Sequence, residues 1–315
     1  MNRKRALVIA TELATNGLES GASLRVNSIH EVLMSVNFEV TVVPRKDAKR
    51  ALDRNWDLVV LVSFSTAKFL RLARKSTSCL WFDPTDSWKL TRLSLIRKGE
   101  LKQIFALTRD YFYLLRTPKI DVLTFISKRD ALKETRWVIK RTNPLIMPNI
   151  GLDRNISSSR ESRFVFVGEG SYGPNKQALD YLDKVLKNLP ENVEIHLFGN
   201  NLNSSNPRFV VNGYVESSDL YRKSDIYLAP IENGAGIKMK VAVPLWNGLR
   251  VIASPEAANG FSKSEGLEIA ATPEEFASKI LAASTFGTVE SLGFPAEAIY
   301  EVNQIPLLKG RLAAL

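Results

Sequence analysis

Short runs of consecutive apolar residues recur along this chain of 315 residues, and they restrict its fold more than any other feature. Most runs, such as 6–10 and 226–229, are apolar at successive positions rather than at alternate ones. Strands of this kind are buried on both faces, which is typical of parallel sheets covered by helices. The strands predicted in this way lie at 6–10, 38–43, 57–62, 78–82, 121–126, 145–147, 163–167, 193–198, 209–211, 226–229, 249–253 and 267–270.

Helical spacing fills many of the intervals between these runs, at 23–36, 89–115, 175–189, 237–246 and 273–283. Alternation of strands with helices predicts a doubly wound α/β architecture. A polar, serine-rich stretch at 151–162 interrupts the pattern and is typical of a linker. We therefore expect two Rossmann-like α/β domains with parallel sheets, at 1–150 and 163–315, that face each other across a cleft. The last helix is expected to pack back on the N-terminal domain.

Charge is divided unevenly along the chain, although the net charge is +10. Residues 1–160 hold 29 Lys/Arg against 15 Asp/Glu, a balance of +14, and residues 161–315 hold 14 against 18, a balance of −4. A strongly basic half predicts either an anionic partner, such as a membrane surface, a lipid phosphate or nucleic acid, or a solvated face without a partner. The basic side chains considered for such a surface are Arg71, Arg74, Lys75, Arg92, Arg97, Lys98 and Lys102.

Composition also restricts the compartment and the chemistry. A lone cysteine, Cys79, excludes a disulfide framework. The apolar run near the N-terminus is too short for a signal peptide, and no stretch approaches the roughly 18 apolar residues of a membrane span. We expect a cytoplasmic protein, peripheral at most on the inner face of the membrane. With two histidines and no clustered Asp-x-Asp, we expect neither a metal nor a resident cofactor.

A glycine motif follows the predicted strand at 163–167. The segment Gly168-Glu-Gly-Ser-Tyr-Gly173 matches the G-x-G-x-x-G pattern of dinucleotide-binding proteins. The next predicted strand, however, ends in His196-Leu-Phe-Gly199 rather than in the acid that would hold a ribose hydroxyl. We therefore interpret the glycines as a turn that lets a ligand approach the backbone and a helix N-terminus, not as a nicotinamide site.

The most informative segment runs from Asp225 to Ala253. Gly234 and Gly236 separate a predicted strand from a predicted helix that starts at Ile237, and Lys238 and Lys240 follow in its first turns. Free backbone N–H groups, the helix dipole and two cations together favour a diphosphate. The alternative is a tight glycine turn with solvated lysines. Lys176, beside the Gly168 turn, could reach the same phosphates.

The segment Gly234-Ala-Gly-Ile-Lys-Met-Lys240 resembles the helix start of group 1, family-4-type glycosyltransferases with the GT-B fold. Phe164–Lys176, Asn212–Glu216, Pro148–Asp153 and Gly21–Arg25 resemble other segments of that family, and Phe82–Lys89 resembles its exopolysaccharide-associated subgroup. The resemblance implies a metal-independent, retaining transfer of a sugar from a nucleotide-sugar donor to a polysaccharide or lipid-linked acceptor. The donor-binding residues that we predict are Gly21, Arg25, Gly168, Gly170, Asn175, Lys176, Glu232, Gly234, Ala235, Gly236 and Ile237, and the catalytic ones are Asp86, Lys238 and Lys240.

Two departures from the family pattern concern the nucleotide ribose. Family members carry a glutamate three residues beyond the second lysine and another eight residues earlier, but Val243 and Ala235 occupy these positions here. Loss of a charged acceptor would cost about 1.5–3 kcal/mol. Either Glu232 substitutes, or donor affinity is weak, or the chain is a non-catalytic homologue that acts as a binding or regulatory partner. A glycosyltransferase that modifies nucleic acid is a further alternative.

Asp86 is the candidate for contact with the sugar or the acceptor, together with Asp83, because paired carboxylates often serve in this way. The structural alternative is a capped turn, in which Asp86 or Ser87 is the N-cap of the predicted helix that follows.

Overall fold

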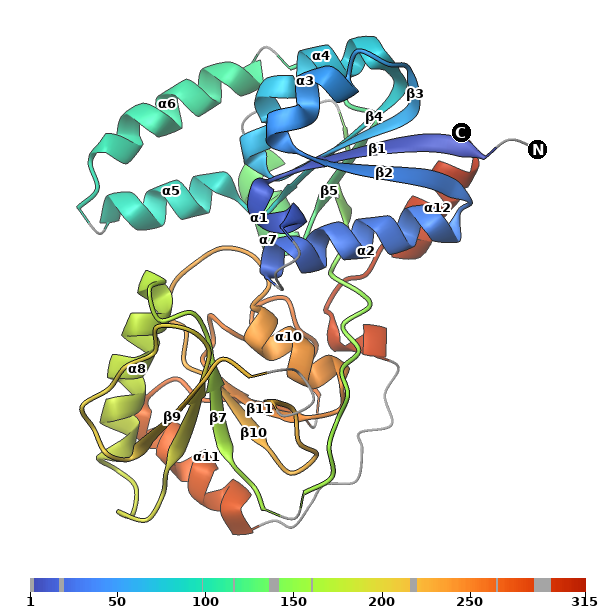
Figure 1. Ribbon diagram of the computed structural model, residues 1–315. Helices are drawn as coiled ribbons and strands as arrows, with labels where there is room; N and C mark the ends of the chain where they lie inside the picture. Colours follow the sequence, from blue (N-terminus) through green and yellow to red (C-terminus); the bar gives the residue numbers. More distant parts are fainter. Residues whose placement is uncertain are drawn as a thin grey trace. The chain divides into compact units, whose positions relative to one another are not determined.

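A computed structural model describes residues 3–16, 20–97, 99–115, 117–135, 142–159, 161–215, 220–264, 266–285 and 296–315. The chain forms two compact units (Figure 1). Unit 1 comprises Met1–Gly151 with Ala235–Ile237 and Val302–Leu315, and unit 2 comprises Leu152–Gly234 and Lys238–Glu301. The serine-rich stretch that the sequence marks as a linker thus begins unit 2, where the backbone N–H of Ser157 donates to the carbonyl oxygen of Tyr221 at 3.0 Å.

Unit 1 is built on a parallel six-stranded sheet of order β2-β1-β3-β4-β5-β6. The predicted strands of this half are all present, with small differences at their ends, because long apolar runs are the strongest strand signal in a buried sheet. Their bounds are β1 Lys4–Ala10, β2 Phe38–Pro44, β3 Trp56–Val62, β4 Thr77–Thr85, β5 Val122–Phe125 and β6 Leu145–Ile146.

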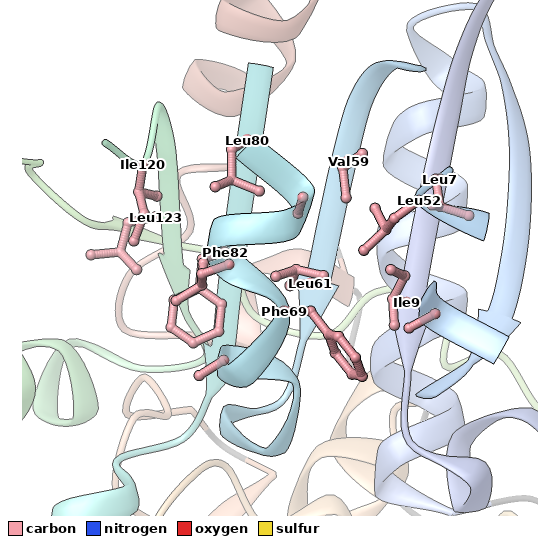
Figure 2. Close-up of a cluster of buried hydrophobic side chains, with 14 of the residues drawn as sticks. Leu7, Ile9, Leu52, Val59, Leu61, Phe69, Leu80, Phe82, Ile120 and Leu123 are labelled. Carbon is pink, nitrogen blue, oxygen red and sulfur yellow. The ribbon is translucent and has the colours of Figure 1, made fainter. Parts of the chain in front are cut away.

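Helices cover both faces of this sheet. On one face, side chains of α3, α4 and the preceding 3₁₀ helix η2 pack against Leu7, Ile9, Leu61 and Phe82 of the strands (Figure 2). On the other face α2 lies beside α12 (Figure 1). The helices of unit 1 are α1 Glu12–Thr15, α2 Gly21–Ser35, η1 Arg45–Asp47, α3 Ala48–Ala51, η2 Phe64–Phe69, α4 Leu70–Ser76, α5 Trp88–Arg97, α6 Lys102–Leu115, α7 Lys128–Thr135 and α12 Ile305–Ala313.

The single helix that spacing predicts at 89–115 is wrong, because the structure divides it into α5 and α6. Gly99 between them has φ +88°, a left-handed conformation that glycine adopts without steric cost. The backbone N–H of Gly99 donates to the carbonyl oxygen of Ile96 at 2.9 Å, and the chain reverses there from α5 into α6. Periodicity alone does not detect a break of this kind, because both helices keep apolar residues at helical spacing.

Unit 2 carries a second parallel sheet, of order β12-β11-β10-β7-β8-β9. The six strands predicted in this half are again present. Their bounds are β7 Phe164–Val167, β8 Ile195–Phe198, β9 Phe209–Gly213, β10 Ile226–Ala229, β11 Arg250–Ala253 and β12 Leu267–Ile269. The order reverses between β7 and β10, and open α/β sheets bind ligands outside the carboxyl ends of strands at such a point.

The helical elements that the structure describes in unit 2 are α8 Gly173–Leu186, α10 Met239–Trp246, α11 Pro273–Thr285 and the 3₁₀ helix η3 Ala296–Ile299. Helices α8 and α11 contact each other, with the Tyr181 and Phe276 rings edge to face at 5.4 Å. Helix α10 packs on β10 and β11 and carries Pro244 in its second turn, beyond the first turn where proline is best tolerated. None of the helices in the described residues has the length and apolar character needed to cross a membrane.

Candidate functional site

The turns that follow β7 and β10 hold most of the residues predicted to bind the donor. These two strands pair in parallel, with Ile226 opposite Phe164 and Tyr227 opposite Val165. Their carboxyl ends therefore lie next to each other, and α8 follows one strand whereas α10 follows the other. The topology thus brings the Gly168 turn and the lysines of α10 to the same edge of the sheet.

Close packing within unit 2 surrounds two glycines of the Gly168 turn, whereas a Cβ atom at Gly173 would meet nothing within 4 Å. A Cβ atom at Gly170 would lie 1.8 Å from the carbonyl oxygen of Asn201, and one at Gly168 would lie 2.7 Å from Nδ2 of Asn175. The backbone N–H of Gly170 also donates to the carbonyl oxygen of Asn200 at 2.8 Å. The motif is therefore a turn packed against the loop after β8, and its interpretation as something other than a dinucleotide fingerprint stays a prediction.

Asn175 connects the two turns. Its side chain is buried in the first turn of α8, where Nδ2 donates to the carbonyl oxygen of Glu169 at 2.8 Å. Its Oδ1 accepts a hydrogen bond from Nζ of Lys240 at 2.7 Å. The amide therefore fixes the ammonium group of α10 beside the turn that follows β7, so the structure brings two of the predicted site residues into direct contact.

Lys240 is a half-buried cation with neutral surroundings. Its Nζ lies 4.2 Å from the centroid of the Phe166 ring, in cation–π contact, besides the hydrogen bond to Asn175. Within the part of the chain that the structure describes, both side chains in contact with this ammonium group are neutral. Burial, and secondarily the charge of Lys238, lowers the pKa of Lys240 to about 7. An anion at this position would favour the charged form.

Lys238 is the N-cap residue of α10, and its side chain is 12% exposed. Its Nζ lies 3.9 Å from Oε1 of Glu256, in the turn after β11. Gly234 precedes it with φ +135°, and a Cβ atom at Gly234 would lie 3.4 Å from Nζ of Lys238. Sequence reasoning missed Glu256, because its separation from Lys238 along the chain gives no signal of their proximity.

The other predicted donor-binding residues have varied surroundings. Lys176 and Glu232 are exposed in unit 2. Ala235 and Gly236 are half-buried and Ile237 is buried, and these three residues belong to unit 1. Gly236 has φ +73°, which explains the need for glycine there. Val243, at the position of the family glutamate, is only 4% exposed on α10.

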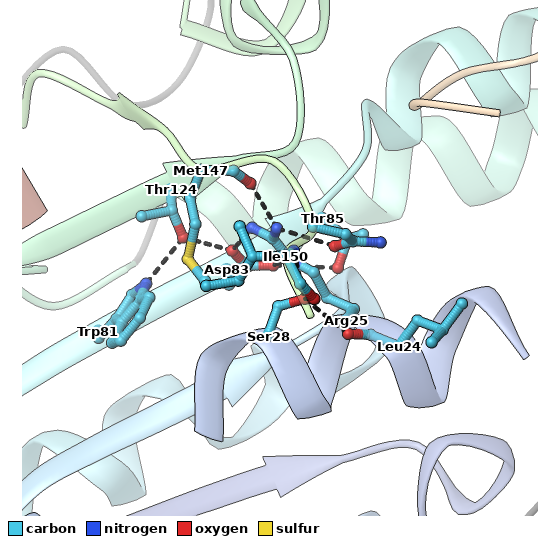
Figure 3. A network of polar contacts seen from close by, with 10 residues as sticks. Leu24, Arg25, Ser28, Trp81, Asp83, Thr85, Thr124, Met147 and Ile150 are labelled. Atoms are coloured by element: carbon cyan, nitrogen blue, oxygen red, sulfur yellow. Dashed lines mark hydrogen bonds and ion pairs between the residues drawn. The ribbon is translucent and has the colours of Figure 1, made fainter. Parts of the chain in front are cut away.

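In unit 1, Arg25 and Asp83 form a buried ion pair (Figure 3). The guanidinium group of Arg25, on α2, donates to both carboxylate oxygens of Asp83 at the end of β4, to the carbonyl oxygen of Met147 and to Oδ1 of Asn149. Arg25 is 1% exposed. The bonds join α2, β4 and the segment after β6, so they give Arg25 a structural role within unit 1. Its predicted contact with the donor stays a prediction.

The same carboxylate supports the backbone next to Asp86. Asp83 accepts hydrogen bonds from the hydroxyls of Thr85, at 3.0 Å, and Thr124 (Figure 3). Thr85 has φ +75°, a conformation that costs a non-glycine residue of the order of 1–3 kcal/mol and is concentrated at functional sites. Asp86 follows directly and is half-buried. Gly21, the remaining candidate, is the first residue of α2 after the N-cap Ser20.

The capped-turn alternative is correct for Ser87. Its Oγ accepts from the backbone N–H of Leu90 at 3.1 Å, which is the N-cap interaction for α5. Two carboxylates of α7 complete the helix start: Oδ1 of Asp130 accepts from the Ser87 backbone N–H at 2.9 Å, and Oε1 of Glu134 accepts from the Ser87 hydroxyl at 2.6 Å and the Lys89 N–H at 2.9 Å. Burial raises the pKa of Glu134 to about 7. Sequence reasoning missed both, because it predicted no helix there.

The basic residues predicted to form one surface are divided between elements. Arg71, Arg74 and Lys75 lie on α4, where Arg74 pairs with Asp121. Arg92 lies on α5 and Lys102 on α6. Lys98 and the side chain of Arg97 lie outside the described residues, as does Glu216 at the end of the family-like segment Asn212–Glu216.

The described residues contain no group of three His, Cys, Asp or Glu side chains arranged to hold a metal ion. What unit 2 provides instead is a cationic site at the reversal of the strand order. Such a site can hold a diphosphate and stabilise the negative charge that develops on it as a leaving group.

Protein-family models and curated proteins show no match to this chain. Solved structures do resemble it. Anabaena HepE in complex with UDP and glucose has a TM-score of 0.66 at 13% identity, covering 99% of this chain and 100% of its own. Arabidopsis thaliana UGT89C1 complexed with quercetin has a TM-score of 0.50 at 11% identity, covering 99% of each chain. Identities this low establish the fold, and they confirm two α/β units with parallel sheets.

Proposed function

We propose that this protein is a glycosyltransferase that moves a sugar from a nucleoside diphosphate sugar to a glycan or lipid-linked acceptor. The observation that carries the proposal is the contact between Lys240 and Asn175 at the reversal of the strand order in unit 2. It holds a cation with neutral neighbours where ligands of such sheets bind. The solved structure of HepE with UDP-glucose, a similar fold, supports a nucleotide-sugar donor.

In this proposal, Lys238, Lys240 and the backbone of the glycine loop neutralise the departing diphosphate. Preorganised cations aimed at developing charge are effective in partly buried sites, because no reorganisation is needed at the moment of reaction. The resemblance to family-4-type enzymes, nearest the exopolysaccharide-associated subgroup, supports a metal-independent, retaining transfer. We assign Asp86 to contact with the sugar or the acceptor, and we place the protein at the inner face of a membrane, where the basic half meets anionic lipid.

Calorimetry tests the donor site. Uridine, thymidine, guanosine and adenosine diphosphate sugars are titrated into the wild type, Lys240→Gln and Lys187→Gln. Lys187 is an exposed cation at the other end of α8, so its replacement removes the same charge away from the site. We expect Lys240→Gln to weaken donor binding by about tenfold to a hundredfold, since a hydrogen bond to a charged group contributes about 1.5–3 kcal/mol. Equal affinity of the two variants, or no binding of any donor, would contradict the proposal.

The buried valine at position 243 supports a second candidate, a homologue that binds a nucleotide or a partner without catalysing transfer. Val243 is 4% exposed and stands where the family carries the ribose-binding glutamate. An activity assay separates an active transferase from the non-catalytic homologue. Donor hydrolysis and transfer are measured as the nucleoside diphosphate that is released over a long incubation. Tight donor binding with no release above a Lys240→Gln background would favour the non-catalytic homologue.

A further inference from the structure

The helical hairpin of unit 1 turns apolar side chains outward. Helices α5 and α6 pack on each other, α5 also contacts α7, and the pair extends from the sheet (Figure 1). The hairpin turn is fixed by hydrogen bonds from Arg92 to Oε1 of Gln103 at 2.6 Å and from Gln103 to Oε2 of Glu100 at 2.9 Å. The orientation of α6 on α5 is therefore set by specific polar contacts.

Three large apolar side chains share the outer face at the start of α6. Leu101 is 66% exposed, Ile104 46% and Phe105 81%. Spacing of three and four residues places them on one side of the helix, whereas Ala106 and Leu107, on the opposite side, are half-buried. A helix of a water-soluble domain normally turns its apolar stripe to the core. Here apolar residues lie on the inner side and also on the exposed side, and the exposed ones mark an interaction surface.

Cations border this face. Lys102 and Arg109 are seven residues apart, so they lie on the same flank of α6, next to the apolar residues, and both are exposed. The hairpin 88–115 holds six Lys/Arg against two Asp/Glu, a balance of +4. Apolar residues with basic residues beside them are the pattern of helices that lie in the headgroup region of anionic bilayers.

We propose that the face formed by Leu101, Ile104 and Phe105 docks on an anionic bilayer, with the apolar side chains among the lipid chains and Lys102 and Arg109 on the phosphates. The docking holds unit 1 on the membrane as an interfacial, non-spanning attachment. It rests on the proposed function only for its purpose, which is to bring the protein to a lipid-linked acceptor, and it can be measured without any sugar.

Vesicle sedimentation gives the first test. Wild type, the double variant Leu101→Ser with Phe105→Ser, and Leu307→Ser are mixed with vesicles of about 30% phosphatidylglycerol in phosphatidylcholine, a composition that attracts basic segments. Leu307 is 50% exposed on α12 and is the matched control. We expect the double variant to lose about tenfold or more in partitioning, since burial of both side chains contributes to docking, and Leu307→Ser to bind as the wild type does.

A fluorescent probe gives the second test, independent of partitioning. Cys79 is buried, so an environment-sensitive thiol label attaches selectively to Phe105→Cys or to the control Leu307→Cys. Anionic vesicles are expected to shift the emission to the blue and increase it for the first label only. Equal responses of both labels would overturn the proposal.

Other outcomes show whether a bilayer or a second copy of the chain covers the face formed by Leu101, Ile104 and Phe105. Wild-type binding to anionic vesicles that the double variant retains would overturn the proposal, as would a wild type that ignores them. Loss of self-association in the double variant, by sedimentation velocity without lipid, would assign the face to a second copy of the chain. Donor affinity in lipid-free solution tests the proposed function separately, because the double variant is expected to keep it.

Discussion

The polar groups beyond β4 in unit 1 and those beyond β7 and β10 in unit 2 lie at corresponding edges of their sheets, but their charges are arranged differently. In unit 1, Arg25 and Asp83 form a buried ion pair, whereas Glu134 accepts hydrogen bonds from a hydroxyl and a backbone N–H at the start of α5. In unit 2 the side chains that contact the ammonium group of Lys240 are neutral. Burial moves the pKa of Glu134 and of Lys240 to about 7 from opposite directions.

The difference separates a supporting structure from a binding site. A network whose charges are matched within the protein stabilises one conformation, and removing one partner leaves a buried charge uncompensated. A cation that lacks a matching carboxylate costs stability in the free protein, but it gains an interaction when an anion binds. Unit 1 thus fixes the backbone that carries Asp86, and Lys240 in unit 2 is the cation that we propose to hold the diphosphate.

The largest effect is expected from removing one partner of the buried ion pair between Arg25 and Asp83. Arg25→Ala should lower the free energy of unfolding by about 3–5 kcal/mol, because the Asp83 carboxylate stays buried without its partner. Urea unfolding measures it, with Arg74→Ala as the control. Arg74 pairs with Asp121 where the two side chains are 30% and 23% exposed, so its loss should cost about 1 kcal/mol or less.

Apolar replacement of both partners sharpens that result. Arg25→Met combined with Asp83→Leu should recover much of the stability that Arg25→Ala loses, since well-packed apolar residues often replace a buried ion pair without loss. Equal costs for Arg25→Ala and Arg74→Ala would show that burial of the pair contributes nothing special.

The next effect concerns the position of the family glutamate. Val243→Glu should destabilise the protein by about 2–3 kcal/mol, because the new carboxyl group would be buried on α10. It should also fail to tighten donor binding. Val211→Glu, at a valine that is 47% exposed on β9, should change stability by about 0.5 kcal/mol or less. A stable Val243→Glu protein with higher donor affinity would mean that only the ribose acceptor is missing here.

Apolar runs predicted the strands of both sheets, and the signal is strongest in central strands such as β3 and β10, which are buried on both faces, whereas the edge strands β2, β9 and β12 are partly exposed. The site itself stays a prediction, although the structure brings several of the residues predicted for it together. The carboxyl ends of β7 and β10 lie next to each other as the sequence predicts, but nothing in the sequence reveals that Asn175 bonds Lys240 or that burial lowers the lysine pKa. Glu134 escaped prediction for a similar reason, since its role comes from α7 packing beside α5, a contact remote in sequence.

The pH dependence of stability tests the environment of Glu134 in unit 1. Its pKa is about 7 in the folded protein and 4.5 without burial, so between these values the folded state retains a proton that the unfolded state loses. Stability from this group is therefore fully present below about 4.5 and falls as pH rises to about 7, by about 2.5 kcal/mol between pH 5 and pH 8. Glu134→Gln should remove this fall in urea unfolding at pH 5 and 8, whereas Glu39→Gln, at an exposed residue of β2, should retain it.

The smallest expected effect is the pH dependence of donor binding at Lys240. Here the measured quantity is donor affinity rather than the free energy of unfolding. Lys240 has a pKa of about 7 when the donor is absent, and a bound diphosphate raises that pKa, so the charged form binds more tightly. Donor affinity should be greatest below pH 7 and fall by up to about tenfold per pH unit above it, which is about 1.4 kcal/mol. A nucleoside diphosphate sugar is the suitable ligand, because its diphosphate, esterified at both ends, keeps its charge over this range. Calorimetry at pH 6.5 and 8.5 should show the loss in the wild type and in Lys187→Gln but not in Lys240→Gln. A slope that survives in Lys240→Gln would move the titrating group elsewhere and leave unit 2 without the charge imbalance that distinguishes it from unit 1.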